Sequence, residues 1–186
     1  MSAVASLDTR VLVAGIGNIF LGDDGFGSEV ARVLAGQRMP AGVRVTDYGI
    51  RGMHLAFDLL DGYDALVIVD TVPSRGSPGA LHVFEVGPED LGDGELDAHG
   101  MAPTAVLASL GSLGGALPRT LVVGCEPATV EEQIGLSAPV AAAVDRAVDT
   151  VRSLIARELS TPDPAVPAGP RGTSGPLSAA EKESPQ

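Results

Sequence analysis

The sequence predicts an α/β fold: a three-layer α/β/α sandwich with a mostly parallel, twisted sheet of about five strands and helices on both faces. Two observations lead to this prediction. Short apolar runs alternate along the chain with longer segments in which apolar residues recur at helical spacing. Aromatic residues make up only 3% of the chain and Trp is absent, so the core must consist of Val, Leu, Ile and Ala, which suits a buried parallel sheet.

The individual elements follow from these patterns. Residues 65–69 (ALVIV) form the clearest central strand, and 11–14 is a similar short run that ends at Gly15. Alternating or short apolar runs predict the other strands, and 3.6-residue spacing predicts the helices. The remaining strands are predicted at 43–48, 81–86 and 120–123, and the helices at 25–34, 53–60, 103–113 and 138–154.

The composition changes near residue 160. Residues 160–186 are rich in Pro, Gly, Ser and Ala and contain almost no large apolar side chains, so they cannot bury enough surface to offset their ordering entropy. We therefore expect one domain over residues 1–159 and a disordered tail over 160–186.

Charge and cysteine content exclude several classes of protein. The formal net charge is -12, from 24 acidic and 12 basic residues, which argues against nucleic acid and anionic membranes and favours cationic partners or metal ions. The single cysteine, Cys125, excludes an intramolecular disulfide and a Cys-based zinc site, and we expect it to be a core thiol. Without a signal-like segment or an apolar run of about 20 residues, the protein is expected to be cytoplasmic and not membrane-bound.

The first turn, GIGNIFLGDDGFG at residues 15–27, is the most informative segment. A Gly-x-Gly after a first strand suggests a dinucleotide site, but Phe20 stands where the third glycine of that fingerprint belongs. Asp23 and Asp24 stand near the expected helix N-terminus, where they would repel a phosphate. A nucleotide site is therefore disfavoured.

The two aspartates have an ordinary explanation and a functional one. Asp is a favoured helix N-cap, so one or both could serve only that purpose. We expect Asp23 to be the cap and Asp24 to be the functional group, although the spacing alone leaves the assignment open.

Asp70 and His99 extend the functional reading. Asp70 follows the most hydrophobic strand, at the edge of the sheet where open α/β folds bind ligands, and it would share a crevice with Asp24 if the first strand is a neighbour. Its ordinary alternative is to cap the loop at 71–73.

His99 lies in a loop before a predicted helix, and two carboxylates with one imidazole suit a divalent transition metal. His54 and His82 fit less well, because one is in a helix pattern and the other is mid-strand.

These segments together resemble the hydrogenase maturation proteases. Members of that family open with a strand, Gly-x-Gly-Asn, a short apolar stretch and Asp-Asp or Asp-Glu before Gly. An Asp at the end of a hydrophobic strand, a loop His before a helix, and Gly-x-x-Pro followed by Gly-Leu-Ser come later. The similarity covers residues 10–157. The matching residues are Gly15, Gly17, Asn18, Asp23, Asp24, Gly25, Gly27, Asp70, His99, Gly124, Pro127, Gly135, Leu136 and Ser137.

The resemblance implies an aspartic-type endopeptidase that removes a C-terminal extension from the nickel-loaded large subunit of a nickel-iron hydrogenase. It implies that Asp24, Asp70 and His99 contact the metal and carry the catalysis. It also implies that no cofactor is tightly bound, that nickel is supplied by the substrate, and that the partner is the large-subunit precursor. We expect a monomer.

Two other functions remain open from the sequence. A non-catalytic nickel-binding carrier would use the same three groups, and a metallopeptidase with another protein substrate would carry its own metal ion. No HExxH motif is present, and the placement of residues suggests no Ser-His-Asp or Cys-His arrangement. Peptide hydrolysis by a water activated at a metal or by a carboxylate is the chemistry that remains.

Overall fold

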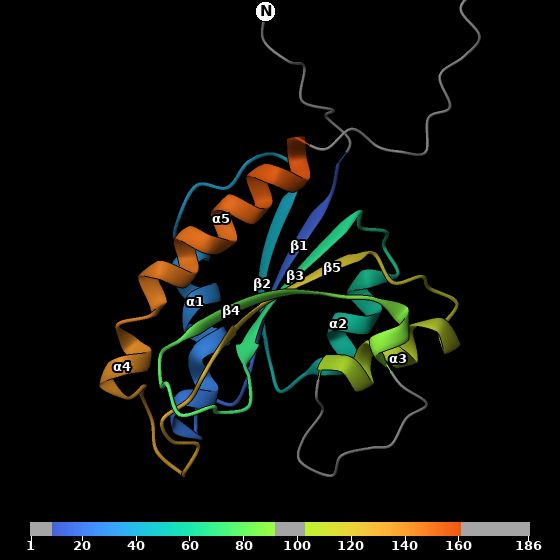
Figure 1. The fold of residues 1–186 in the computed structure, drawn as a ribbon. Coiled ribbons are helices and arrows are strands. Elements are labelled where there is room, and N and C mark those ends of the chain that lie inside the picture. The colour runs from blue at the N-terminus through green and yellow to red at the C-terminus, as the bar shows by residue number, and fades with distance from the viewer. Residues whose placement is uncertain (1–8, 92–102, 161–186) are drawn as a thin grey trace, which may run out of the picture.

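The computed structural model describes residues 9–91 and 103–160. Within these ranges five strands form one sheet in the order β2-β1-β3-β5-β4 (Figure 1). The first four in this order run parallel, and β4 is antiparallel to β5 at the edge. This confirms the predicted, mostly parallel sheet. The strands are β1 (Val11–Ile16), β2 (Val43–Gly49), β3 (Ala65–Thr71), β4 (Leu81–Val86) and β5 (Arg119–Cys125).

Helices cover both faces of the sheet, as the three-layer prediction requires. Figure 1 shows α1, α4 and α5 on one face and α2 and α3 on the other. Strand β1 explains why both layers form: Val11 and Val13 pack toward α1 and α5, whereas Leu12 and Ala14 pack toward α2 and α3. The helices are α1 (Phe26–Ala35), α2 (Gly52–Leu59), α3 (Pro103–Ser112), α4 (Ala138–Ala141) and α5 (Val144–Ser160), and the short 3-10 helices are η1 (Gly22–Gly25) and η2 (Pro88–Leu91).

The predicted single helix at 138–154 is divided into α4 and α5. The Ala143 N–H donates to the carbonyl of Val140, three residues back, instead of to Pro139, four residues back. This tighter turn interrupts the regular hydrogen-bond ladder of an α-helix. The sequence did not reveal the break, because the apolar spacing continues across it.

The fold tests the expectation for Cys125. Cys125 is fully buried, and burial raises the pKa of its thiol to about 11, so the prediction of a core thiol is confirmed. Among the described residues, no helix is long and apolar enough to cross a membrane. The tail at 160–186 lies, apart from Ser160, outside the described residues, and Ser160 itself is the last residue of α5.

The chain order creates a switch point at the carboxyl ends of β1 and β3. From β1 the chain passes through α1 to β2 on one side of β1, and then through α2 to β3 on its other side. In the register between them, Gly15 of β1 lies opposite Val69 of β3. The segment after Gly15 and the segment after Val69 therefore leave the sheet side by side, at the position where open α/β sheets bind ligands.

Candidate active site

The glycines of the first turn allow three backbone segments to approach closely. Gly17 has φ of +137°, a conformation that favours glycine, and a Cβ there would overlap the carbonyl oxygen of Asp24. A Cβ on Gly15 would overlap the carbonyl oxygen of Gly27 in the first turn of α1. The glycine pattern therefore serves to pack η1 and α1 against the end of β1, and it places Asp24 over the strand ends.

The carboxylate of Asp24 is held from two sides. Its Oδ2 accepts a hydrogen bond of 2.8 Å from the backbone N–H of Asn18, and its Oδ1 accepts one of 3.2 Å from the hydroxyl of Thr71. The side chain is only partly buried. Asp24 makes no helix-capping hydrogen bond, so the functional interpretation of this residue is favoured over the capping one.

Asp70 lies at the end of β3, directly before Thr71, whose hydroxyl binds Asp24. The pKa of its carboxyl group is raised to about 8, mainly by burial and to a smaller extent by the negative charge of Asp24. A hydrogen bond of 2.7 Å from the Thr71 N–H to Asp70 Oδ1 acts in the opposite direction. The neighbouring positions of β1 and β3 bring the two acids close enough for the charge of Asp24 to act on Asp70.

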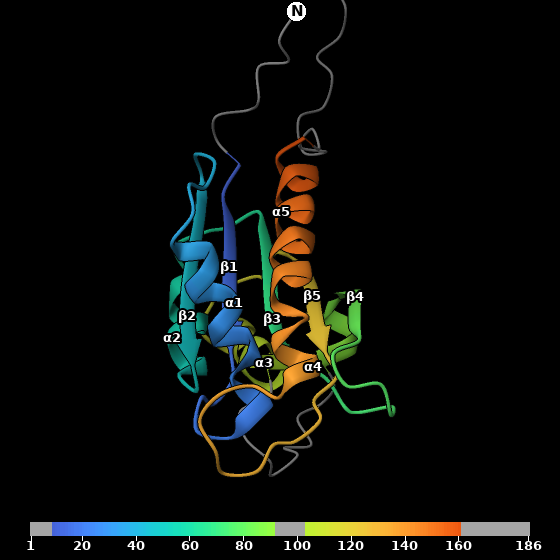
Figure 2. The ribbon, with the colours of Figure 1, turned by 90° about the vertical axis from the view of Figure 1, so that its left-hand side faces the viewer.

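The expectation that Asp23 caps the helix is wrong. The Asp23 side chain is fully buried and accepts four hydrogen bonds from the segment between β5 and α4, which lies beside the first turn (Figure 2). The donors are the N–H groups of Ala128 (2.7 Å), Thr129 (3.1 Å) and Ser137 (2.6 Å) and the hydroxyl of Ser137 (2.8 Å). Burial pushes the pKa of Asp23 upward, but these hydrogen bonds outweigh it and the pKa is lowered. Donors more than 100 residues away satisfy the carboxylate, so it has no capacity left for the helix.

A second buried carboxylate, Glu126, orders the segment that follows Asp70. It accepts hydrogen bonds from the N–H groups of Arg75 (2.7 Å) and Ser77 (3.0 Å), and its Oε1 lies 2.7 Å from His82 Nε2. These contacts lower the pKa of Glu126, with the Arg75 hydrogen bond contributing most. His82 lies on β4, as the sequence predicts, with its imidazole bound to Glu126.

The third predicted site residue, His99, lies outside the described residues. His54 is exposed on α2. Within residues 9–91 and 103–160, no three His, Cys, Asp or Glu side chains gather into a group that could hold a metal ion. The described part of the site therefore contributes two carboxylates, Asp24 and Asp70.

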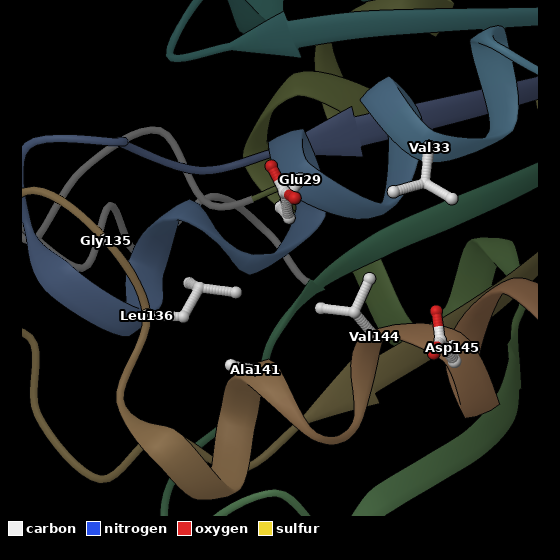
Figure 3. A pocket seen from close by; sticks show the side chains of 7 residues that line it. All are labelled: Glu29, Val33, Gly135, Leu136, Ala141, Val144 and Asp145. Carbon is white, nitrogen blue, oxygen red and sulfur yellow. The ribbon is translucent and has the colours of Figure 1, made fainter.

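A separate pocket of about 450 Å³ lies between α1 and the start of α5 (Figure 3). Its walls are mainly apolar, with one carboxylate from α1 and one from α5. Figure 3 shows the side chains of Leu136 and Val144 directed toward the space between these helices. The lining residues are Glu29, Val33, Gly135, Leu136, Ala141, Val144 and Asp145.

Sequence reasoning missed Glu126 and Thr71 and assigned the wrong role to Asp23. Asp23 and Glu126 act through partners far away in sequence or on a loop backbone, and no local pattern reports such contacts. Thr71 had a signal, because a hydroxyl residue directly after Asp70 at a strand end lies within reach of whatever group faces that strand. A contact between Thr71 and Asp24 can therefore be predicted from the sequence once β1 is known to be the neighbour of β3.

Comparison with known proteins identifies the family. The family model for hydrogenase maturation proteases matches residues 28–154, which is more than half of the chain. The chain belongs to the hydrogenase maturation protease family. It is therefore a peptidase, and the resemblance inferred from its motifs is confirmed.

Individual relatives of this protease agree with that result. It is 34% identical over 150 residues to the hydrogenase expression/formation protein HupD of Rhodobacter capsulatus, covering 78% of this chain and 71% of the relative. Its fold is similar to the hydrogenase maturating endopeptidase HybD from E. coli, with a TM-score of 0.69, 28% identity and coverage of 80% and 93%. A hydrogenase 2 maturation peptidase from a Thaumarchaeota archaeon gives a TM-score of 0.63 at 33% identity, with coverage of 80% and 99%. These maturation peptidases share the α/β architecture described above.

Proposed function

We propose that this protease removes a C-terminal extension from the nickel-loaded large subunit of a nickel-iron hydrogenase, acting in the cytoplasm as a monomeric, aspartic-type endopeptidase. One observation carries the proposal: Asp24 and Asp70 meet at the switch point of the sheet and are linked through Thr71 in a chain of the maturation protease family. Open α/β sheets bind their ligands at such a point.

In this proposal the metal belongs to the substrate. Asp24, Asp70 and His99 contact the nickel that the precursor carries, and no cofactor is resident in the protease. Carboxylate oxygens and an imidazole suit a divalent transition metal and leave positions for the groups of the precursor. Recognition of the nickel then ties cleavage to completed metal insertion, because a precursor without nickel does not fill the crevice.

The carboxylates of Asp24 and Asp70 favour the binding of a cation. The negative charge of Asp24 disfavours the ionised form of Asp70 and is one of the causes of its raised pKa. A divalent cation relieves this repulsion. A water molecule polarised in the same crevice then attacks the carbonyl carbon of the scissile peptide, the C–N bond breaks, and a proton passes to the leaving amine.

The deciding experiment is mass spectrometry of a nickel-loaded, cognate large-subunit precursor after incubation with the protease. Loss of one discrete C-terminal peptide is expected with the wild type and with Asp149→Ala, a matched control on the exposed face of α5. Asp24→Ala and His99→Ala are expected to leave the precursor intact while keeping the circular dichroism spectrum and Tm of a folded protein. Full activity of well-folded Asp24→Ala removes the proposal.

Metal analysis of the purified protein separates this function from its alternatives. We expect far less than one equivalent of bound metal and no processing of a nickel-free precursor. A full equivalent of metal, with cleavage of a different protein, identifies a metallopeptidase that carries its own ion. Binding of free nickel without cleavage of any precursor identifies a carrier. Size-exclusion chromatography of the purified protease tests whether it is a monomer, as proposed.

A further inference from the structure

Four large apolar side chains are exposed on the two loops that flank Asp24. Ile19 and Phe20 lie between β1 and η1 and are 49% and 61% exposed. Val130 and Ile134 lie between β5 and α4 and are 52% and 81% exposed. We call these four residues the apolar platform. Such side chains are scattered singly on ordinary surfaces, but a group of them beside a functional site marks an interaction surface.

The two loops that carry the platform are joined to each other along their backbones. Leu21 and Gln133 form a parallel β-bridge, the N–H of Gln133 donates to the Phe20 carbonyl (3.0 Å), and the N–H of Gly22 donates to the Gln133 carbonyl (2.8 Å). The buried Asp23 holds the same pair of loops together through its four hydrogen bonds. The platform is therefore preorganised, which lowers the entropic cost of binding a partner.

The platform is linked to Asp24 through Asn18. The N–H of Asn18 holds the Asp24 carboxylate (2.8 Å), and the side-chain oxygen of the same Asn18 accepts the N–H of Phe20 (3.0 Å). Because both loops are hydrogen-bonded to Asp23 or Asp24, a polypeptide that presents a peptide bond at Asp24 lies beside them. Part of its length then lies against the platform.

Charge and shape around the platform specify the chemistry of the bound segment. Glu131 and Glu132 are exposed between Val130 and Ile134, and residues 15–25 and 126–137 contain no Lys or Arg. The two residues that follow Ile134, Gly135 and Leu136, line the pocket whose rim carries Glu29 and Asp145 (Figure 3). An apolar surface with an acidic border matches an apolar segment with Lys or Arg residues next to it.

We propose that the apolar platform docks an apolar, basic-flanked segment of the hydrogenase large-subunit precursor and so aligns its C-terminal extension with Asp24. The inference rests on the proposed function, and it adds a surface that determines affinity and is distinct from the residues that carry the chemistry. The platform acts on precursor binding, whereas Asp24 acts on cleavage.

The test uses Ile134→Ser and Phe20→Ser, with Phe57→Ser as the matched control. Phe57 is 52% exposed on α2, in the helix layer on the other face of the sheet from α1. With a nickel-loaded precursor, each platform variant is expected to raise KM about tenfold, an effect typical of an important interface residue, with kcat within about twofold of wild type. The Phe57→Ser variant is expected to keep the wild-type KM. Equal KM values for the platform variants and wild type overturn the inference.

The charge of the bound segment is tested separately. The double variant Glu131→Gln, Glu132→Gln is expected to raise KM at low salt, and the difference from wild type is expected to shrink as salt screens the interaction. A KM that is lower in the double variant than in wild type overturns the basic-flanked assignment.

A binding measurement keeps the two proposals apart. The dissociation constant of the precursor is measured with Asp24→Ala, with and without Ile134→Ser in the same chain, so that it does not depend on cleavage. If wild type fails to cleave but Ile134→Ser weakens binding, the proposed function fails and the docking surface stands. If wild type cleaves and Ile134→Ser changes neither binding nor KM, only the docking surface fails.

Discussion

Two adjacent aspartates in this protease have opposite environments. Asp23 is fully buried and its carboxylate accepts four hydrogen bonds from residues between 128 and 137. Asp24 is partly buried and accepts two, from Asn18 and Thr71. The Asp23 carboxylate is fully hydrogen-bonded within the protein, whereas the Asp24 carboxylate keeps lone pairs that can bind a ligand.

The difference shows how a rigid site can be built from a loop. A loop that presents a reactive carboxylate needs a fixed backbone, and here the preceding residue supplies the anchor. The anchor and the functional group are one residue apart, so a small displacement of Asp23 is transmitted to Asp24. Stability and chemistry are thereby divided between neighbours, and this division can be tested by mutation.

Asp23→Ala is expected to have the largest effect on stability. Removal of a buried acceptor leaves four donors unsatisfied, and a loss of about 3 kcal/mol in the free energy of unfolding is expected. Asp24→Ala is expected to cost about 1 kcal/mol or less, because only two donors lose a partner at a partly exposed site. Urea unfolding of both variants measures the difference. Equal losses for the two variants contradict the division of roles.

The lowered pKa of Asp23 adds a pH dependence to that comparison. The ionised side chain stabilises the folded state at pH values above its ordinary pKa of 3.8, and this contribution is lost as the pH falls through the lower value in the folded protein. The stability gap between wild type and Asp23→Ala is therefore expected to be constant near neutral pH and to narrow only in strong acid.

Asp70→Asn is expected to shift stability in the opposite sense. The folded protein keeps a proton on Asp70 up to a pH of about 8, whereas the unfolded chain loses it near the ordinary pKa of 3.8. The contribution of this group to stability is thus complete below 3.8 and is lost as the pH rises through about 8. The Tm of the variant should therefore rise relative to that of wild type between pH 5 and pH 9. The expected gain is about 2–4 °C for each kcal/mol by which the variant avoids the cost of burying Asp70. Differential scanning calorimetry across this range detects the trend, and a Tm difference that does not vary with pH contradicts it.

Thr71→Val is expected to give the smallest effect of the three. The variant keeps the volume of the side chain but removes the hydroxyl that binds Asp24 Oδ1. The lost hydrogen bond positions the Asp24 carboxylate, and an energy of about 1 kcal/mol corresponds to a fivefold to tenfold lower kcat/KM. Cleavage rates for Thr71→Val and Thr71→Ser provide the measurement. Thr71→Ser keeps a hydroxyl and is expected to recover most of the activity, and equal losses in both variants argue for a packing role instead.

The fold was accessible from the sequence because its signals are local. The ALVIV run of β3 is buried on both faces, and its composition reports this directly. The meeting of Asp24 and Asp70 followed from one further assumption, that the first strand is the neighbour of the third, which the register confirms.

The contacts of the site were less accessible, because they join distant parts of the chain. Local rules assign Asp23 to a helix cap, and nothing near it in sequence indicates that Ser137 satisfies the carboxylate instead. The division of the predicted last helix at Ala143 is equally invisible to apolar spacing. The role of His99 stays a prediction from the family resemblance.

The glycines of the first turn have a consequence for recognising such proteins. In a dinucleotide-binding chain the glycines make room for a pyrophosphate, whereas here Gly17 makes room for the backbone of Asp24 and Gly15 for the backbone of Gly27. The same Gly-x-Gly pattern thus makes room for a ligand in one fold and for the protein's own backbone in the other. A search pattern that requires an acidic pair after Gly-x-Gly-Asn should distinguish the two uses, since carboxylates at this position would repel a phosphate.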